Sequence, residues 1–293
     1  MEIIDGKKIA AEIKETIKAE IANIIDHGER APHLVAVLVG EDPASETYVA
    51  AKEKACREVG ITSSVYRLAD TVKEDELLKV IGFLNVDEEV DGYIVQLPLP
   101  KHINETKILE AILPSKDVDG FHPANLGRMV LGLPTFLPAT PYGILKMLEY
   151  HKIETEGKHC VVLGRSNIVG TPMSLLMSRK ANPGNCTVTL CHTKTTNVKE
   201  ICLTADIIIA AVGQVNYVTA DMVKNGAVVI DVGMHRIADE SKQSGFRLTG
   251  DVDFKNVAPK CKAISPVPGG VGPMTIVSLI LNTLKAYKKE VYS

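Results

Sequence analysis

The stretch that most constrains the fold is residues 160–172, CVVLGRSNIVGTP, where an apolar strand runs into a glycine-bounded turn and then into a helix. A strand that ends at a helix N-terminus directs free backbone N–H groups and the positive end of the helix dipole at one point, which suits a phosphate. Gly164 lets the chain turn without a Cβ, and Gly170 lets the helix approach the strand closely. The turn departs from G-x-G-x-x-G because Ser166 stands at the middle glycine and the outer glycines are one residue further apart. We expect a dinucleotide site here, with an ordinary strand-to-helix turn as the alternative.

The end of the next strand indicates which dinucleotide is bound. An NAD site usually carries Asp or Glu there, to accept hydrogen bonds from the ribose hydroxyls. In this chain the strand over residues 187–191 is followed by His192, Thr193 and Lys194, and Arg165 lies in the phosphate turn. An adenosine with an extra 2′-phosphate requires cationic and hydroxyl donors. The sequence therefore favours NADP over NAD, with a solvated loop as the alternative for the threonine and the lysine.

Strand-like and helix-like segments alternate along the 293 residues, which predicts an α/β protein with parallel sheets covered by helices. The length suits two lobes, an N-terminal three-layer α/β domain and a Rossmann-type dinucleotide-binding domain, separated by a loop-like segment at residues 115–138. We place the first domain at residues 1–139 and 274–293 and the second at residues 140–273. The closing apolar helix, which we expect to begin at Pro273, should pack back on the first lobe. Helices are predicted over residues 6–26, 46–59, 73–84 and 140–151, and strands over residues 34–39, 62–68, 92–97, 206–212 and 227–232.

Composition excludes several classes of function. A net charge of −3 and 4% aromatic residues give neither a basic surface nor stacking platforms, so we expect no nucleic-acid or membrane partner. No apolar run approaches the roughly 18 residues of a membrane span, and no signal peptide is apparent. The six cysteines show no C-x-x-C spacing, which is typical of reduced, buried thiols in a cytoplasmic protein. No H-E-x-x-H or Cys/His cluster indicates a metal site.

Four further groups are candidates for chemistry. Tyr48 and Lys52 are four residues apart and share a helical face, although a solvated lysine on an alanine-rich helix is the alternative. Gln96 stands at the carboxyl end of an apolar strand, where α/β sheets place ligands; a glutamine that satisfies loop backbone groups is the alternative. In the segment D-V-D-G, a carboxylate such as Asp119 suits an amino-pyrimidine ring, or simply makes a turn. The glycines of residues 268–272 permit close approach to a flat ring, unless they form a flexible connection.

Taken together, these motifs resemble the bifunctional methylenetetrahydrofolate dehydrogenase/methenyltetrahydrofolate cyclohydrolase family. The resemblance implies oxidation of methylenetetrahydrofolate with NADP, followed by hydrolysis of the methenyl form to formyltetrahydrofolate. It also implies a reduced folate as substrate and a homodimer formed through the cofactor domain. The matching segments, in order along the chain, are residues 45–55, 95–100, 116–123, 164–172 and 268–275.

The resemblance also implies a role for each matched residue. Lys52 matches the essential cyclohydrolase lysine, Tyr48 stacks near the folate, Gln96 contacts and tunes the lysine, and Asp119 holds the pterin ring. The family often carries serine where this chain has Thr193, which keeps the hydroxyl. The implied substrate-binding residues are Tyr48, Val49, Lys52, Val95, Gln96, Leu97, Asp119, Pro268, Gly269, Gly270, Val271 and Gly272. The implied cofactor-binding residues are Gly164, Arg165, Ser166, Gly170, His192, Thr193, Gly213 and Met234.

Elementary chemistry agrees with this division of labour. Hydride removal from a methylene bridge leaves a cation stabilised by its two nitrogens, so positioning against the nicotinamide suffices. Hydrolysis needs a group that accepts a proton from water and later donates one, and Lys52 is the candidate for that role. Three alternatives stay open: a monofunctional NAD(P)-dependent methylenetetrahydrofolate dehydrogenase, a shikimate-type dehydrogenase, and a non-catalytic nucleotide-binding module.

Overall fold

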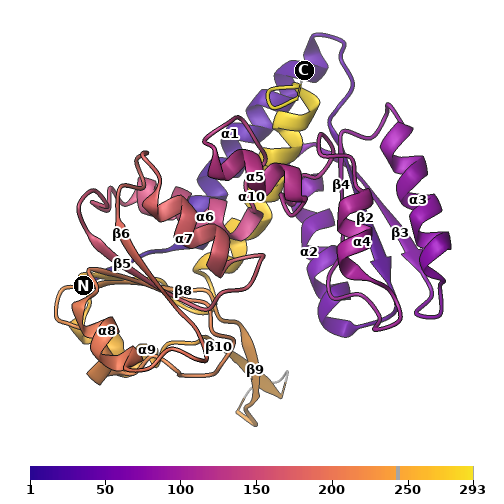
Figure 1. Cartoon of the computed structure of the whole chain (residues 1–293). Helices are drawn as coiled ribbons and strands as arrows, with labels where there is room; N and C mark the ends of the chain where they lie inside the picture. Colours follow the sequence, from indigo (N-terminus) through magenta and orange to yellow (C-terminus); the bar gives the residue numbers. More distant parts are fainter. Residues whose placement is uncertain (242–244, 293) are drawn as a thin grey trace. The chain divides into compact units, whose positions relative to one another are not determined.

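The computed structural model describes residues 1–241 and 245–292 (Figure 1). The chain divides into two compact units, each built around its own parallel sheet. The six-stranded unit comprises Met1–Ala10 and Thr140–Thr275, and the three-stranded unit comprises Ala11–Ala139 and Ile276–Ser293. Residues 1–10 thus belong to the six-stranded unit, whereas the sequence assigned them to the first domain.

The predicted α/β architecture with parallel sheets is confirmed in both units. In the six-stranded unit, helices cross between parallel strands, and Figure 1 places α6 and α7 on one side of the sheet and α8 and α9 on the other. The strands, in spatial order, are β1 (Glu2–Ile3), β11 (Ala263–Ile264), β8 (Val228–Asp231), β7 (Ile207–Ala210), β5 (His159–Leu163) and β6 (Thr187–Cys191). The helices are α6 (Ala139–Tyr150), α7 (Gly170–Ser178), α8 (Val198–Thr204) and α9 (Phe254–Val257), with 3₁₀ turns at Ala220–Met222 and Ala258–Lys260.

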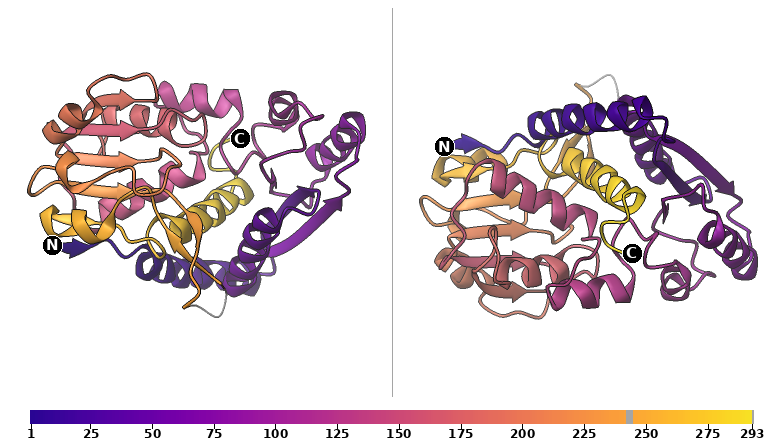
Figure 2. Two further views of the ribbon diagram at one scale, coloured as in Figure 1. Left: turned by 90° about the horizontal axis from the view of Figure 1, so that it is seen from below. Right: turned by 90° about the horizontal axis from the view of Figure 1, so that it is seen from above.

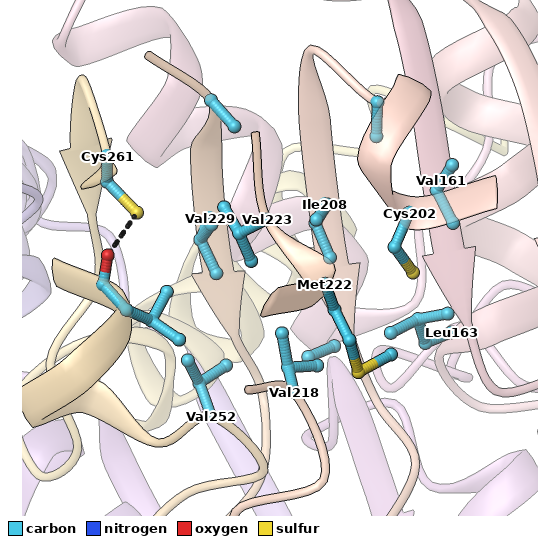
Figure 3. Packing of buried hydrophobic residues seen from close by; sticks show 14 of the residues in the cluster. Val161, Leu163, Cys202, Ile208, Val218, Met222, Val223, Val229, Val252 and Cys261 are labelled. Carbon is cyan, nitrogen blue, oxygen red and sulfur yellow. Dashed lines mark hydrogen bonds between the residues drawn. The ribbon is translucent and has the colours of Figure 1, made fainter. Parts of the chain in front are cut away.

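The core of this unit explains its apolar strands. Val161, Ile208 and Val229 lie in register across β5, β7 and β8, and Figure 3 shows Cys202 of helix α8 between Val161 and Ile208, with Val229 next to Val223. Because both faces of the sheet are covered, these strands read as near-continuous apolar runs rather than as alternating ones. All six cysteines are free and buried, which confirms the expectation of buried, unpaired thiols.

An antiparallel pair of strands, β9 (His235–Ala238) and β10 (Phe246–Thr249), was not expected from the sequence. It follows β8 and forms a separate two-stranded sheet. Half-buried and exposed residues alternate along β9 but only over the first three residues of β10, and four residues are too short a pattern to distinguish a strand from a loop.

The three-stranded unit has the strand order β3 (Thr62–Leu68), β2 (His33–Val39), β4 (Gly92–Val95). Its helices are α2 (Pro43–Val59), α3 (Glu74–Val86), α4 (Glu105–Ala111) and α5 (Pro123–Val130), together with parts of α1 (Gly6–Asp26) and α10 (Val271–Tyr287). Ile17 and Ile21 of α1 share a core with Leu279 and Leu284 of α10, and Figures 1 and 2 show the two helices side by side. The predicted return of the closing helix is therefore confirmed.

Four predicted helix starts differ from the observed ones, and the smallest differences are of one residue, as at α3, which begins at Glu74 and not at residue 73. Helix α2 begins at Pro43, because Asp42 caps it by accepting a hydrogen bond from the backbone N–H of Ser45 at 2.8 Å. Helix α6 already includes Ala139. Helix α10 begins at Val271, two residues before the expected Pro273, since proline is also tolerated within a first helical turn.

The loop-like interpretation of residues 115–138 is also wrong, since the segment contains helix α5. His122 caps this helix through its Nδ1 atom, which accepts a hydrogen bond from the N–H of Ala124 at 2.9 Å, and Pro123 is its first residue. A proline at the first helical position is a start signal, and the surrounding glycines and prolines obscured it. The segment lies within the three-stranded unit, which continues to Ala139.

Candidate functional site

The phosphate turn in the six-stranded unit is held by two close backbone approaches. A Cβ on Gly170 would lie 1.9 Å from the carbonyl oxygen of Gly164, and a Cβ on Gly164 would lie 2.0 Å from that of Ala211. Gly164 also has a φ of +105°. The predicted close approach of helix and strand is therefore confirmed, and it explains why both positions require glycine.

Ser166 accounts for the departure from the usual glycine pattern. Its Oγ accepts hydrogen bonds from the backbone N–H groups of Val169 at 3.2 Å and of Gly170 at 3.4 Å. The Val169 side chain does not cap helix α7, so the hydroxyl of Ser166 receives the first amides of the helix. A turn with a glycine at each end, a helix N-terminus and a hydroxyl at the start of that helix together suit the binding of a dinucleotide phosphate.

The turn after β6 is organised by its own side chains. The N–H of His192 donates to Thr195 Oγ1 at 2.9 Å, and the N–H of Lys194 donates to His192 Nδ1 at 3.2 Å. In the neutral ring the remaining proton is therefore on Nε2, which is free to act as a donor. Thr193 is exposed at the tip of this turn.

The same edge of the sheet carries Arg165. It follows β5, whose last residue Leu163 is in register with Cys191, the last residue of β6. The structure therefore brings Arg165 and the exposed Thr193 to neighbouring strand ends. A cation and a hydroxyl at this edge are the donors that an adenosine phosphate needs.

Two other predicted cofactor residues follow the next strands of the sheet. Gly213, with a φ of +75°, lies after β7, and Met234 lies after β8. Met234 is 40% exposed, and its Cε lies 3.9 Å from where a Cβ on Gly272 would be. The glycine-rich turn of residues 268–272 and Met234 therefore come together within the six-stranded unit.

That glycine-rich turn is tied to the start of helix α1. The N–H of Lys7 donates to the carbonyl oxygen of Gly269 at 2.9 Å, and a Cβ on Gly6 would lie 1.9 Å from that of Gly270. Val271 is already the first residue of α10 and is buried. These contacts exclude the flexible-connection alternative.

In the three-stranded unit, Lys52 and Gln96 are joined directly. Lys52 Nζ, on α2, donates to Gln96 Oε1 at 3.1 Å. The orientation of the glutamine amide is fixed because its Nε2 donates to the carbonyl oxygen of Leu97 at 2.7 Å. Gln96 thus both contacts the lysine and satisfies a loop carbonyl. Tyr48 lies one turn earlier on α2 and is 41% exposed.

The two carboxylates of the D-V-D-G segment have different surroundings. Asp117 is buried and accepts hydrogen bonds from the N–H of His122 at 2.8 Å and from Asn125 Nδ2 at 2.9 Å, so it holds the turn. Burial raises the pKa of the Asp119 carboxyl, and the positive charge of Lys52 opposes that rise. Of the two carboxyl groups, Asp119 is the one whose pKa the charge of Lys52 lowers.

The predicted substrate-binding residues Val49 and Val95 are buried in two hydrophobic clusters of the unit. Their side chains are consequently part of the core, and they flank the site through the backbone of α2 and β4. Three functional candidates were missed: Asp231, His235 and Asp251. Asp231 ends a buried strand, which is a usable signal, whereas the other two depend on the unexpected pair β9 and β10.

Two kinds of feature are absent from residues 1–241 and 245–292. No helix there is long and apolar enough to cross a membrane. In the same described residues, no group of three or more His, Cys, Asp or Glu side chains is arranged to hold a metal ion.

The fold and the phosphate turn define a two-unit α/β protein of the dinucleotide-binding class. Family comparison matches residues 4–119 to the tetrahydrofolate dehydrogenase/cyclohydrolase catalytic domain and residues 138–291 to the NAD(P)-binding domain of the same family. The chain therefore belongs to the tetrahydrofolate dehydrogenase/cyclohydrolase family.

Individual relatives match over the full length. The chain is 62% identical to the bifunctional protein FolD of Porphyromonas gingivalis, over 98% of this chain and 97% of the relative. It is 61% identical to that of Bacteroides fragilis over all of both chains. Among solved structures, the bifunctional FolD of Campylobacter jejuni has a TM-score of 0.93 at 48% identity, covering 99% of each chain.

A Trypanosoma brucei methylenetetrahydrofolate dehydrogenase-cyclohydrolase, solved with NADP cofactor and an inhibitor, has a TM-score of 0.93 at 35% identity and covers 99% of this chain and 98% of its own. A shikimate dehydrogenase from Peptoclostridium difficile reaches a TM-score of 0.51 at 14% identity, over 87% of this chain and 91% of its own, and so shares the fold alone. The shikimate-type alternative therefore has no support beyond the fold.

Proposed function

We propose that this protein oxidises methylenetetrahydrofolate to methenyltetrahydrofolate with NADP and then hydrolyses the methenyl form to formyltetrahydrofolate. The observation that carries the proposal is the hydrogen bond from Lys52 Nζ to Gln96 Oε1, with the carboxyl of Asp119 within the electrostatic reach of the same lysine. The family and the bifunctional relatives agree with the proposal.

Hydrolysis is assigned to the three-stranded unit. The Lys52 amine takes a proton from the attacking water and later returns one to a ring nitrogen of the folate. Gln96 orients that amine, because its own amide is held by the carbonyl of Leu97. Asp119 binds the amino-pyrimidine part of the pterin by paired hydrogen bonds, and Tyr48 stacks beside it.

Cofactor binding is assigned to the six-stranded unit. NADP, when bound, accepts the hydride; the chain's own task is to hold it in position. The Ser166 hydroxyl and the positive end of the α7 dipole bind the phosphates. Arg165, His192 and Thr193 bind the 2′-phosphate, while Gly213 and Met234 contact the nicotinamide.

The choice of NADP over NAD is supported by three donors at one edge of the sheet and by the NADP complex of the Trypanosoma brucei relative. The folate-binding catalytic domain is the three-stranded unit, and the NADP-binding domain is the six-stranded unit. We further propose a homodimer formed through the NADP-binding domain and a location in the cytoplasm.

The test replaces the proposed hydrolytic lysine. Lys52→Met removes the amine and keeps the length of the side chain, so hydrolysis of methenyltetrahydrofolate should fall to background while hydride transfer remains measurable. Absorbance of the methenyl product, followed with methylenetetrahydrofolate and NADP, separates the steps: the variant should accumulate methenyltetrahydrofolate that the wild type removes.

Lys54→Met is the matched control, since that side chain is on the same helix, is 78% exposed and is 4.0 Å from Glu58. It should retain both activities. Loss of both activities in a folded Lys52→Met variant, or retained hydrolysis, would show that the division of labour is wrong.

A further inference from the structure

Two carboxylates in the six-stranded unit have no part in the proposed chemistry. Asp231 is 2% exposed and Asp251 is fully buried. Burial of ionisable groups is unfavourable unless hydrogen bonds compensate for the lost water. The explanation for this buried pair therefore lies in the groups that donate hydrogen bonds to it.

Asp231, the last residue of β8, joins its own loop to the segment after β10. Its Oδ1 accepts hydrogen bonds from the N–H groups of Gly233 at 3.0 Å and Asp251 at 2.9 Å, and its Oδ2 accepts one from Val252 at 3.0 Å. Burial is the main reason that the pKa of Asp231 is raised to about 6, with these backbone donors opposing the rise. Three amides thus fix one carboxyl group.

Asp251 extends the connection to the loop after β7. Its Oδ2 accepts hydrogen bonds from the N–H groups of Val212 at 2.6 Å and Gly213 at 2.9 Å. Its Oδ1 is bound to His235 Nε2 at 2.8 Å. Since a carboxylate is an acceptor, the histidine Nε2 carries the hydrogen.

The packing around these two groups leaves little room to move. A Cβ on Gly233 would lie 2.3 Å from Asp251 Oδ1, and a Cβ on Gly250 would lie 1.8 Å from Asp231 Oδ2. Main-chain atoms therefore lie directly against both carboxylates. A small displacement of either carboxylate is transmitted to the loops that it binds.

The loops that meet here follow β7 and β8, neighbouring parallel strands in register at Ala210 and Asp231. The carboxyl ends of parallel strands are where α/β sheets place their ligands. One loop carries Gly213 and the other carries Met234, directly before His235. We propose that His235 is a positioning residue which, through Asp251, sets these two nicotinamide-contacting loops for cofactor binding.

This inference rests on the proposed function, because Gly213 and Met234 contact the cofactor only if that function holds. A purely structural role for His235 would affect both activities of the protein, whereas a positioning role would affect only one. The histidine should affect cofactor binding and hydride transfer, whereas hydrolysis by Lys52, in the other unit, should not change.

The experiment compares His235→Leu, which removes the donor, with His235→Gln, whose amide reaches about as far and still donates to Asp251. For His235→Leu we expect the KM for NADP to rise about tenfold to a hundredfold, because a loop misplaced by a fraction of an ångström binds its ligand poorly. Hydrolysis of supplied methenyltetrahydrofolate should stay within about twofold of wild type. His235→Gln should restore the KM for NADP to near the wild-type value.

His151→Leu is the matched control. His151 is also a histidine of the six-stranded unit paired with a carboxylate, Nδ1 lying 2.6 Å from Glu2 Oε1, but its partner belongs to β1. This variant should leave the KM for NADP unchanged. NADP binding by calorimetry provides the same comparison without turnover.

The outcomes are separable. A wild-type protein without hydride transfer would refute the proposed function itself. With an active wild type, an unchanged KM in His235→Leu, an equal loss of both activities, or a failure of His235→Gln to restore binding would each overturn the inference. Should His235→Leu not fold, His235→Ala removes the same hydrogen bond and carries the same expectation; loss of folding in both would assign the pair to stability alone.

Discussion

Alanine at position 170 is the sharpest test of the phosphate turn. The added Cβ would lie 1.9 Å from the carbonyl oxygen of Gly164, 2.5 Å from its carbon and 2.9 Å from the backbone nitrogen of Arg165. A carbon and an oxygen in contact need more than about 3.2 Å, so the turn and the helix must separate by roughly 1.3 Å. All three neighbours are backbone atoms, and no side-chain rotation relieves the overlap.

We expect Gly170→Ala to cost about 3 kcal/mol, the upper end of the range for overpacked sites. In a chain of 293 residues, with an unfolding entropy of about 2.1 cal/mol/K per residue, that lowers the apparent Tm by roughly 5 °C. The turn that moves also carries the amides bonded to Ser166, so the KM for NADP should rise at least about tenfold. Differential scanning fluorimetry and initial-rate kinetics with varied NADP measure the two effects.

The matched control is the same substitution at Gly82. That residue lies inside α3 and is exposed, and a Cβ added to it would have no other atom within 4 Å. Gly82→Ala should therefore raise stability by about 0.5–1 kcal/mol, since it only limits the unfolded chain. Equal stability of the two variants, or an unchanged KM for NADP in Gly170→Ala, would refute the steric argument for the turn.

Arg165→Ala should weaken NADP far more than NAD in parallel initial-rate measurements, and equal losses would contradict the 2′-phosphate assignment. Asn282→Ala should cost about 2–4 kcal/mol in urea unfolding, because the buried amide donates to the carbonyl oxygens of Val118 at 2.8 Å and Leu137 at 2.9 Å; a loss below about 1 kcal/mol would mean that water replaces it. Burial raises the pKa of Asp231 from 3.8 to about 6, so the folded chain keeps a proton that the unfolded chain has released. Relative to Asp231→Asn, the unfolding free energy of the wild type should therefore fall by about 3 kcal/mol between about pH 4 and pH 7, and parallel pH profiles would contradict this.

The features that sequence predicts here are those with a local physical cause. Buried parallel strands have to be apolar on both faces, and β5, β7 and β8 are therefore visible as continuous runs. Gly164 and Gly170 are recognisable because only glycine tolerates the contacts that their positions impose. The helical face shared by Tyr48 and Lys52 follows from spacing alone.

Features that depend on distant partners were not predicted. His235 and Asp251 meet only because β9 and β10 pair, and neither strand is long enough to show a pattern. Asp231 and Asp251 are 20 residues apart along the chain, and the backbone N–H of Asp251 donates to the carboxylate of Asp231. Such a network has no signature in either local sequence, since each aspartate is followed only by a valine and is as typical of a turn as of a buried network.

The D-V-D-G segment shows how one missed element limits the interpretation of a site. Locally, Asp117 and Asp119 are interchangeable, because both precede a small or apolar residue in a turn-like segment, and sequence alone could assign the pterin contact to either. The distinction comes from helix α5, whose capping segment supplies the His122 amide and whose first turn supplies Asn125, and both donate to Asp117. With Asp117 held by these donors, Asp119 is left as the carboxyl group whose pKa responds to the charge of Lys52. If residues 115–138 are taken as a loop, the donors His122 and Asn125 cannot be predicted, and neither can the physical reason for choosing Asp119.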